Sequence, residues 1–110
     1  MVKIVAIISF ISLLLANQVS GQVYELYNGD TINLVTKTMK KVGEWKYFYD
    51  KDRTKIKSEG LFIDNNKEGI WISYYENGAR KNEITYKKNR PIGPARFYYE
   101  NGYIKEEGNW

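Results

Sequence analysis

The sequence predicts an all-β fold: a repetitive antiparallel meander of β-hairpins that forms a single sheet and follows an N-terminal signal helix. A hairpin unit recurs about three times at a spacing of about 24 residues, which is the mark of a repeat protein. Asn-Gly lies between alternating apolar residues in two of these units, and this dipeptide is the strongest short-range signal of a hairpin. Beyond residue 21, no stretch has the 3.6-residue apolar period of a helix.

Residues 1–21 have the pattern of a secretory signal peptide. Lys3 supplies the positive charge, residues 4–16 are almost entirely apolar, and small residues precede Gln22 at the positions typical of a cleavage site. We therefore expect cleavage before Gln22. The alternative is an uncleaved anchor, but this apolar run of about 13 residues is short of the roughly 20 that span a bilayer.

A lead-in at 22–42 precedes the repeats. Strands are expected at 22–27 and 31–36. The second of these is rich in β-branched side chains, which favour a strand. Asn28-Gly29-Asp30 between them is a turn signal. The remaining residues of the lead-in connect it to the repeat domain.

The repeat domain spans 43–110 and consists of the units 43–66, 67–90 and 91–110. Polar linkers at 64–68 and 88–91 separate the units, and the turn of the first unit is the longest. Each unit contributes one hairpin, so six strands are expected, at 44–49, 55–63, 70–75, 80–87, 95–99 and 103–109.

Two-residue Asn-Gly loops fix the strand register. The Asn77-Gly78 loop sets Tyr75 opposite Arg80, and the same reasoning sets Tyr49 opposite Ile56 in the first unit. The cross-strand pairs that follow are Lys46–Glu59, Trp45–Gly60, Ile72–Glu83, Trp71–Ile84, Arg96–Glu107 and Ala95–Gly108. The recurring glutamate thus meets a cation in two of three units, and a tryptophan ring covers a glycine in the first.

Certain positions recur in two or three of the units and are expected to be structural. They are the glycines of turns and strand starts, the packed rings and the recurring glutamates. The set is Gly43, Trp45, Tyr49, Gly69, Trp71, Tyr75, Gly78, Gly93, Tyr99, Gly102, Glu59, Glu83 and Glu107.

Period-two alternation divides the side chains between two faces. One face is expected to be packed and carries most of the rings: Trp45, Tyr47, Tyr49, Trp71, Ser73, Tyr75, Ala95, Phe97 and Tyr99 from the first strands of the units, with Ile56, Phe62, Ile84, Tyr86, Ile104 and Trp110 from the return strands. The other face carries one ring per unit, Phe48, Tyr74 and Tyr98. These three side chains are the candidate binding surface.

The residue types present argue against an enzyme. The chain has no histidine and no cysteine, which excludes ordinary zinc sites, Ser-His and Cys-His nucleophile pairs, a lipoprotein acylation site and disulfides. A glycosidase-like carboxylate pair remains possible in principle, but Glu59, Glu83 and Glu107 occupy equivalent structural positions. We expect no catalytic residue, no cofactor and no metal.

The charge pattern bears on partners. The net charge is +4, or +3 without the signal peptide, and cations and acids are interspersed along the strands. No nucleic-acid footprint results, and a membrane surface would attract the chain weakly at most. Sixteen rings lie beyond the signal peptide, enough to build a sheet surface of packed aromatic side chains.

The pattern Gly-x-Trp-x-x-Tyr-Tyr-x-x-Gly-x-x-Lys-x-Glu resembles the bacterial variant of the MORN repeat (YwqK-type), often described as an antitoxin component. The segments 74–78 and 98–102 match it closely, and the resemblance covers 41–110 with a weaker extension to 28. Departures are Asp52 at the first turn, Ala95 in place of tryptophan, and Ile84 in place of a glycine. The resemblance implies a repetitive antiparallel sheet used for binding.

These observations predict a secreted or periplasmic, non-catalytic binding or scaffold module for a protein or envelope partner. One alternative is an antitoxin- or immunity-like protein that masks a protein toxin. Another is carbohydrate or cell-wall binding through aromatic platforms. Self-association through the C-terminal edge strand is also expected, because an open strand edge invites pairing.

Overall fold

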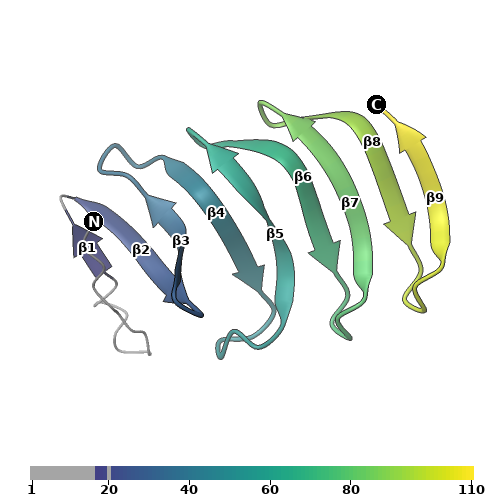
Figure 1. Cartoon of the computed structure of the whole chain (residues 1–110), viewed down its shortest axis with the longest axis horizontal. Coiled ribbons are helices and arrows are strands. Elements are labelled where there is room, and N and C mark those ends of the chain that lie inside the picture. Colours follow the sequence, from purple (N-terminus) through teal and green to yellow (C-terminus); the bar gives the residue numbers. More distant parts are fainter. Residues whose placement is uncertain (1–16, 20) are drawn as a thin grey trace.

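The computed structural model of this chain describes residues 17–19 and 21–110. Nine strands form one antiparallel sheet in which each strand pairs only with its neighbours along the chain (Figure 1). They are β1 (Asn17–Val19), β2 (Gln22–Tyr27), β3 (Asp30–Val35), β4 (Lys41–Phe48), β5 (Ile56–Ile63), β6 (Asn66–Tyr74), β7 (Arg80–Lys87), β8 (Arg90–Tyr98) and β9 (Ile104–Asn109). The predicted all-β hairpin meander is confirmed, and the described residues contain no helix.

Most of the predicted signal peptide lies outside the described residues. Its segment Asn17–Val19, however, forms β1 and pairs with β2. The lead-in contributes β2 and β3, as expected. Within the described part of the chain, no helix is long and apolar enough to cross a membrane.

The turns alternate between the two ends of the sheet (Figure 1). At the upper end, Asp64-Asn65 and Lys88-Asn89 are two-residue turns in which both residues have positive φ, the geometry that suits the twist of a hairpin. The predicted linkers at 64–68 and 88–91 are therefore shorter than expected. Their remaining residues belong to β6 and β8, which begin several residues earlier than predicted.

The Asn-Gly turns at the lower end differ from the prediction. The Tyr75 amide donates to the Ala79 carbonyl, and the Gly78 amide donates to the Tyr75 carbonyl. The loop therefore has three residues, and of these only Gly78 has positive φ, at 91°. This is the three-residue hairpin with a left-handed glycine, so the expected Tyr75–Arg80 pair is wrong. Tyr74 faces Arg80 instead.

A bulged lysine compensates for the extra loop residue. Ser73 pairs with Asn82 while Tyr74 pairs with Arg80, which leaves Lys81 without a partner in the ladder. Lys57 and Lys105 are bulged in the same way in the other two units. Beyond each bulge the predicted register is restored, and the pairs Lys46–Glu59, Trp45–Gly60, Ile72–Glu83, Trp71–Ile84, Arg96–Glu107 and Ala95–Gly108 are all confirmed.

The bulges also correct two face assignments. Ile56 pairs with Phe48, not with Tyr49, and Ile104 pairs with Tyr98. Both isoleucines therefore lie on the face opposite to the one predicted. The cause is the extra residue, because a one-residue shift moves a side chain to the other side of the sheet.

The packed face, here called the aromatic face, holds the core of the repeats. Trp45, Phe62 and Trp71 are buried there, with Tyr47 and Tyr86 partly buried against them. The Phe62 ring lies edge-on to both tryptophans, with centroid separations of 5.6 and 5.0 Å, a favourable arrangement of aromatic quadrupoles. Rings thus supply the core of this sheet, on which the described residues build no second layer.

Two lysines cover this core. The ammonium of Lys41 lies 5.2 Å from the ring centroids of Trp45 and Phe62, and that of Lys67 lies 4.8 Å from Trp71. Their aliphatic stems replace the missing second layer, while the charged ends remain near water. Burial, together with the charge of Lys41, lowers the pKa of Lys67.

One close packing contact explains two departures from the repeat pattern. A Cβ atom at Gly60 would lie 2.3 Å from the Trp71 indole, so the ring of the next unit, and not that of Trp45, covers this glycine. The indole Nε1 donates to the Leu61 carbonyl at 3.0 Å. The equivalent pair between the second and third units is Ile84 on β7 and Ala95 on β8. Here the large residue lies on the return strand and the small one on the strand that follows, the reverse of Gly60 and Trp71.

Candidate binding surface

The candidate residues Phe48, Tyr74 and Tyr98 end β4, β6 and β8. All three are half-buried and lie on the sheet face opposite the aromatic face, as alternation predicts. This side, here called the charged face, also carries Tyr27 from β2. The structure brings the three rings onto one face but gives each a different environment.

Phe48 is covered by its neighbours. Its ring centroid lies 5.4 Å from that of Tyr27, and the Arg53 guanidinium lies 5.9 Å from it. Arg53 is itself held by Glu25 at 3.2 Å and by the Leu26 carbonyl. The long turn of the first unit positions Arg53, and the ring below it is not an open platform.

Tyr74 is part of a charged network. Its hydroxyl donates to Glu59 at 2.5 Å, and the other oxygen of Glu59 accepts from Lys46, also at 2.5 Å. Burial acts to raise the pKa of Glu59, but hydrogen bonds from Lys46 and Tyr74 and the charge of Lys46 outweigh it, so that this pKa is lowered. Burial and the bond to Glu59 raise the pKa of Tyr74 to about 12.

Tyr98 lies at the open end of the face. A hydrogen bond between Arg96 and Tyr98, and the nearby charge of Glu107, raise the pKa of Arg96. The side chains of Arg96 and Glu107 are 54% and 55% exposed, whereas those of Lys46 and Glu59 are 13% and 23% exposed. Solvent access to the charged face therefore increases from the first unit to the third.

The recurring glutamates have structural partners. Glu59 and Glu107 pair with the predicted cross-strand cations. Glu83 faces Ile72 and instead binds Arg80, three residues earlier in the chain. Lys46 is held by two acids, and burial alone would lower its pKa, but the bond to Glu59 raises it.

The tyrosines at the turns tie one unit to the next. The Tyr49 hydroxyl donates to the Tyr74 carbonyl, and the Tyr75 hydroxyl donates to the Tyr98 carbonyl, each at 2.7 Å. The positions predicted as structural turn and strand-start glycines have positive φ: Gly43, Gly69, Gly78, Gly93 and Gly102.

Sequence reasoning missed an aliphatic patch on the charged face. Leu61 is 43% exposed and Ile70 is 61% exposed. A hollow of about 250 Å³ lies beside Ile70, Thr85, Pro94 and Arg96. The alternation of Leu61 with Phe62 and of Ile70 with Trp71 indicates the patch, but the predicted strand begins only at Ile70, whereas β6 begins at Asn66.

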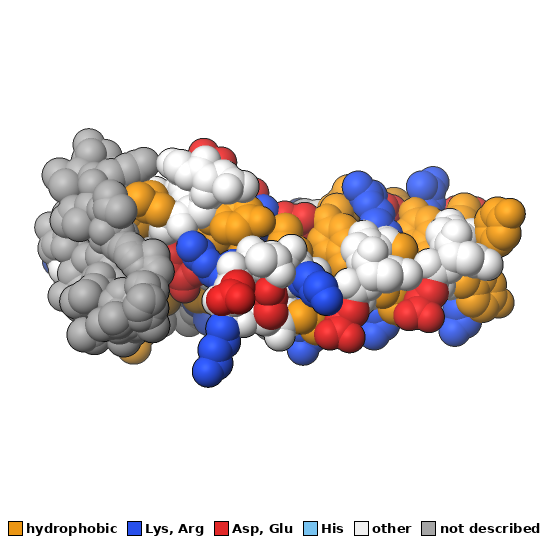
Figure 2. Space-filling model, turned by 90° about the horizontal axis from the view of Figure 1, so that it is seen from below, with side chains coloured by type: hydrophobic (Ala, Val, Ile, Leu, Met, Phe, Trp, Pro, Cys, Tyr) orange, Lys and Arg blue, Asp and Glu red, His pale blue; other side chains and the backbone are white. Residues whose placement is uncertain are grey.

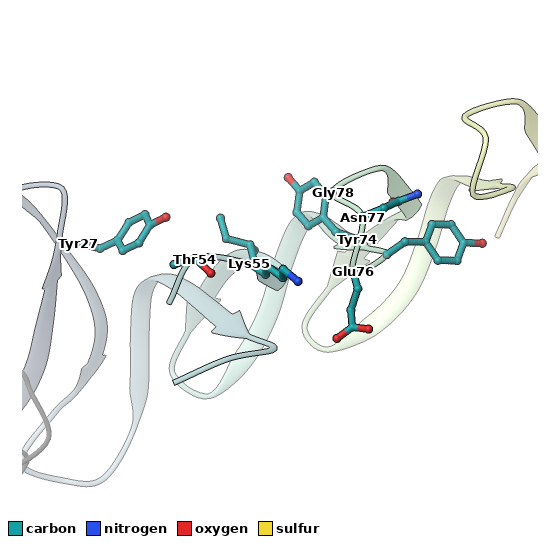
Figure 3. A pocket seen from close by; sticks show the side chains of 9 residues that line it. Tyr27, Thr54, Lys55, Tyr74, Glu76, Asn77 and Gly78 are labelled. Carbon is teal, nitrogen blue, oxygen red and sulfur yellow. The ribbon is translucent and has the colours of Figure 1, made fainter. Parts of the chain in front are cut away.

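A second hollow lies at the turn end of the same face (Figure 3). It has a volume of about 450 Å³ and lies between the rings of Tyr27 and Tyr74, with Lys55 and Glu76 at its rim. The long turn of the first unit contributes Thr54 and Lys55. The charged face thus has two shallow recesses, and Glu83 and Arg96, which belong to its ion pairs, line the smaller one.

The chemistry available here suits binding. Among the described residues, no three acidic side chains lie together as metal ligands would. Seen from the turn end, cationic and acidic side chains alternate along the sheet, with apolar side chains between them (Figure 2). This mixture of aliphatic, aromatic and two-signed polar groups is typical of a protein-binding surface.

Comparison with known proteins identifies the repeat. The family model of the MORN repeat variant matches residues 67–88 and 91–110, which correspond to the second and third predicted units. No curated protein and no solved structure matches the chain significantly. The chain therefore contains a MORN repeat variant, and such repeats are in general non-enzymatic modules that bind proteins or membranes.

Proposed function

We propose that this chain is a non-catalytic β-repeat binding module that acts outside the cytoplasm, in the periplasm or after secretion, and whose partner is another protein. The observation that carries the proposal is the aliphatic patch of Leu61 and Ile70 on a sheet face that no second layer of the described residues covers. Contiguous exposed apolar surface rimmed by polar groups marks interaction sites. The signal-peptide pattern of residues 1–21 supports export.

The charged face favours a protein over other partners. Its cations are paired, as in Lys46–Glu59 and Arg96–Glu107, so little positive potential remains for a polyanion or an anionic membrane. Stacking on sugars requires open ring faces, and the Phe48 ring lies under Arg53. An antitoxin- or immunity-like role is one form of the proposed function, in which the protein partner is a toxin.

Site-specific photo-crosslinking tests the proposal. A photoreactive amino acid is placed at Ile70 in the full chain and, as a matched control, at Met39, which is 76% exposed in a turn away from the patch. We expect a defined protein adduct from position 70 and none from position 39. The partner, identified by mass spectrometry and purified, should then bind the Ile70→Glu variant at least tenfold more weakly than the Met39→Glu variant.

Two outcomes would contradict the proposal. One is the same set of adducts from both positions, which indicates random collision. The other is an unchanged affinity of the purified partner for the Ile70→Glu variant. Circular dichroism on both variants confirms that the sheet is intact, because each substitution is at an exposed side chain and carries little folding cost.

A further inference from the structure

A small polar hollow has its floor on the aromatic face. It has a volume of about 130 Å³ and is lined by Ser58, Ser73 and Asn82, with Lys57 and Lys81 flanking it and Tyr49 and Tyr74 completing the lining. Ser58 pairs with Ser73 and Ser73 pairs with Asn82 across β5, β6 and β7. Their three side chains therefore form one row across adjacent strands and make the floor of the hollow.

The hollow exists because one ring of the repeat is missing. Ser73 occupies the position that Tyr47 and Phe97 occupy in the other two units, and the three residues belong to the same cross-strand row. A ring fills this place on either side. In the third unit, Phe97 and Glu106 occupy the positions of Ser73 and Asn82. The space between Lys81 and Lys105 therefore holds a ring and a carboxylate, and the hollow beside Ser73 has no counterpart there.

The polar groups of the hollow have no partners in the protein. Within residues 17–19 and 21–110, the side chains of Ser58, Ser73 and Asn82 form no hydrogen bond, although they are half-buried. Nor do Lys57 and Lys81 form an ion pair in that part of the chain. Polar groups that are shielded by protein normally have a hydrogen-bond partner in the protein, in ordered water or in a ligand, so these groups are available to a molecule that enters the hollow.

The two lysines are held in place. The ammonium of Lys57 lies 5.7 Å from the Tyr49 ring centroid, and that of Lys81 lies 5.8 Å from the Tyr75 ring centroid. Both lysines are bulged residues, so the backbone directs them away from the regular ladder. Each tyrosine is fixed in turn by its hydroxyl bond to the next unit, so the two cations are fixed on opposite sides of the floor.

We propose that this hollow binds one oxyanion, a phosphate, sulfate or carboxylate group. Two ammonium groups, two hydroxyls and one carboxamide offer donors, and no acidic side chain lines the hollow. Charge-assisted hydrogen bonds to an anion are the strongest that such groups make. The volume suits one such group, because drug-sized ligands need roughly 300–1,000 Å³. The floor of the site lies on the face opposite the aliphatic patch of Leu61 and Ile70, and Tyr74 is the one residue of the candidate binding surface that also lines the hollow.

Titration of the full chain with sodium sulfate, followed by amide NMR, tests the site. We expect saturable shifts at Ser58, Ser73 and Asn82. Replacing a flanking lysine, as in Lys57→Gln or Lys81→Gln, should weaken binding by about fivefold, a loss reduced by solvent screening. The matched control is Lys105→Gln, which removes an equivalent bulged lysine stacked on Tyr99 and should leave the affinity unchanged.

A second pair of measurements identifies the source of the oxyanion. Ser73→Phe fills the hollow with the ring that the third unit already carries, changes no charge, and should abolish binding. Dextran sulfate that binds more tightly than inorganic sulfate, and loses that advantage in Ser73→Phe, indicates a group carried on a polymer. Inorganic sulfate that binds while dextran sulfate is rejected indicates a free ion.

The site is refuted by any of three results. The first is an absence of saturable shifts with sulfate, phosphate and acetate alike. The second is an equal loss of affinity in Lys105→Gln, which would mean that the net positive charge alone attracts anions. The third is undiminished binding by a folded Ser73→Phe variant.

Discussion

Gly60→Ala is expected to be strongly destabilising for a purely steric reason. Gly60 does not have positive φ, so alanine fits its backbone without strain. The added Cβ would, however, lie 2.3 Å from the Trp71 ring, well inside van der Waals contact, and the ring must move. Trp71 is only 4% exposed and fills the centre of the aromatic face, so it has no free space to move into.

The magnitude follows from what the displaced ring loses. Overpacking of a well-packed core costs about 1–3 kcal/mol, and loss of the bond from the indole to the Leu61 carbonyl adds about 1 kcal/mol. Alanine also restricts the unfolded chain more than glycine does, which stabilises the folded state by about 0.4–1 kcal/mol. The net expectation is a loss of about 1–3.5 kcal/mol in the free energy of unfolding, measured by urea denaturation followed by circular dichroism.

Two comparisons decide whether this reasoning is right. Gly108 is the equivalent glycine of β9 and has open space where its Cβ would lie, so Gly108→Ala should be neutral or slightly stabilising. In a Trp71→Ala background the cost of Gly60→Ala should nearly vanish. A Gly60→Ala cost that is unchanged in that background, or an equal cost for Gly108→Ala, would refute the steric explanation.

Three further changes test the packing and the charged network. Ala95→Trp alone should destabilise the sheet by about 1–3 kcal/mol, because Ile84 occupies the space that the ring needs. Adding Ile84→Gly should recover part of this loss in urea denaturation. If the two stability losses simply add, Ile84 and residue 95 do not share the space. The pKa of Tyr74 is raised from 10.0 to about 12 in the folded chain, so its contribution to stability is complete below pH 10 and is lost as the pH rises toward 12. Tyr74→Phe should remove this pH dependence of stability. An ordinary tyrosinate pKa for Tyr74 in ultraviolet titration would contradict this prediction. The pKa of Glu59 is lowered in the folded chain, so its contribution to stability is present above its unfolded pKa and is lost as the pH falls through the folded value. Glu59→Gln should reduce the loss of stability that the protein shows at acidic pH. An unchanged dependence of stability on acidic pH would exclude this role.

The sequence predicted the sheet and its inner register because both depend on patterns that span many residues. The 24-residue spacing and the alternation of Trp45 or Trp71 with polar neighbours identify the strands and the packed face. Turn geometry depends instead on a few local hydrogen bonds. Asn77-Gly78 fits a two- or a three-residue loop equally well by composition, and only the bulge at Lys81 shows which one forms.

The sequence predicts on which side of the sheet the candidate binding residues lie, but not how exposed they are to solvent. Alternation places Phe48, Tyr74 and Tyr98 on one side of the sheet, yet it cannot show that Arg53 covers the first ring. The conformation of the longest turn and the contacts of Arg53 with Glu25 and Leu26, 28 and 27 residues away in the chain, place the guanidinium over the ring. The Trp71–Gly60 contact was missed for a similar reason, since a ring can lean toward either neighbouring strand.

The strictly sequential strand order has a mechanical consequence. Because each strand pairs only with its chain neighbours, tension applied across the 43 Å length of the molecule loads one row of backbone bonds at a time. The sheet should peel from β9, whose residues are all exposed, and the hydroxyl bond from Tyr75 to the Tyr98 carbonyl should mark the first point of resistance. Each hairpin released should lengthen the chain by about 80 Å, so force would extend this protein in regular steps.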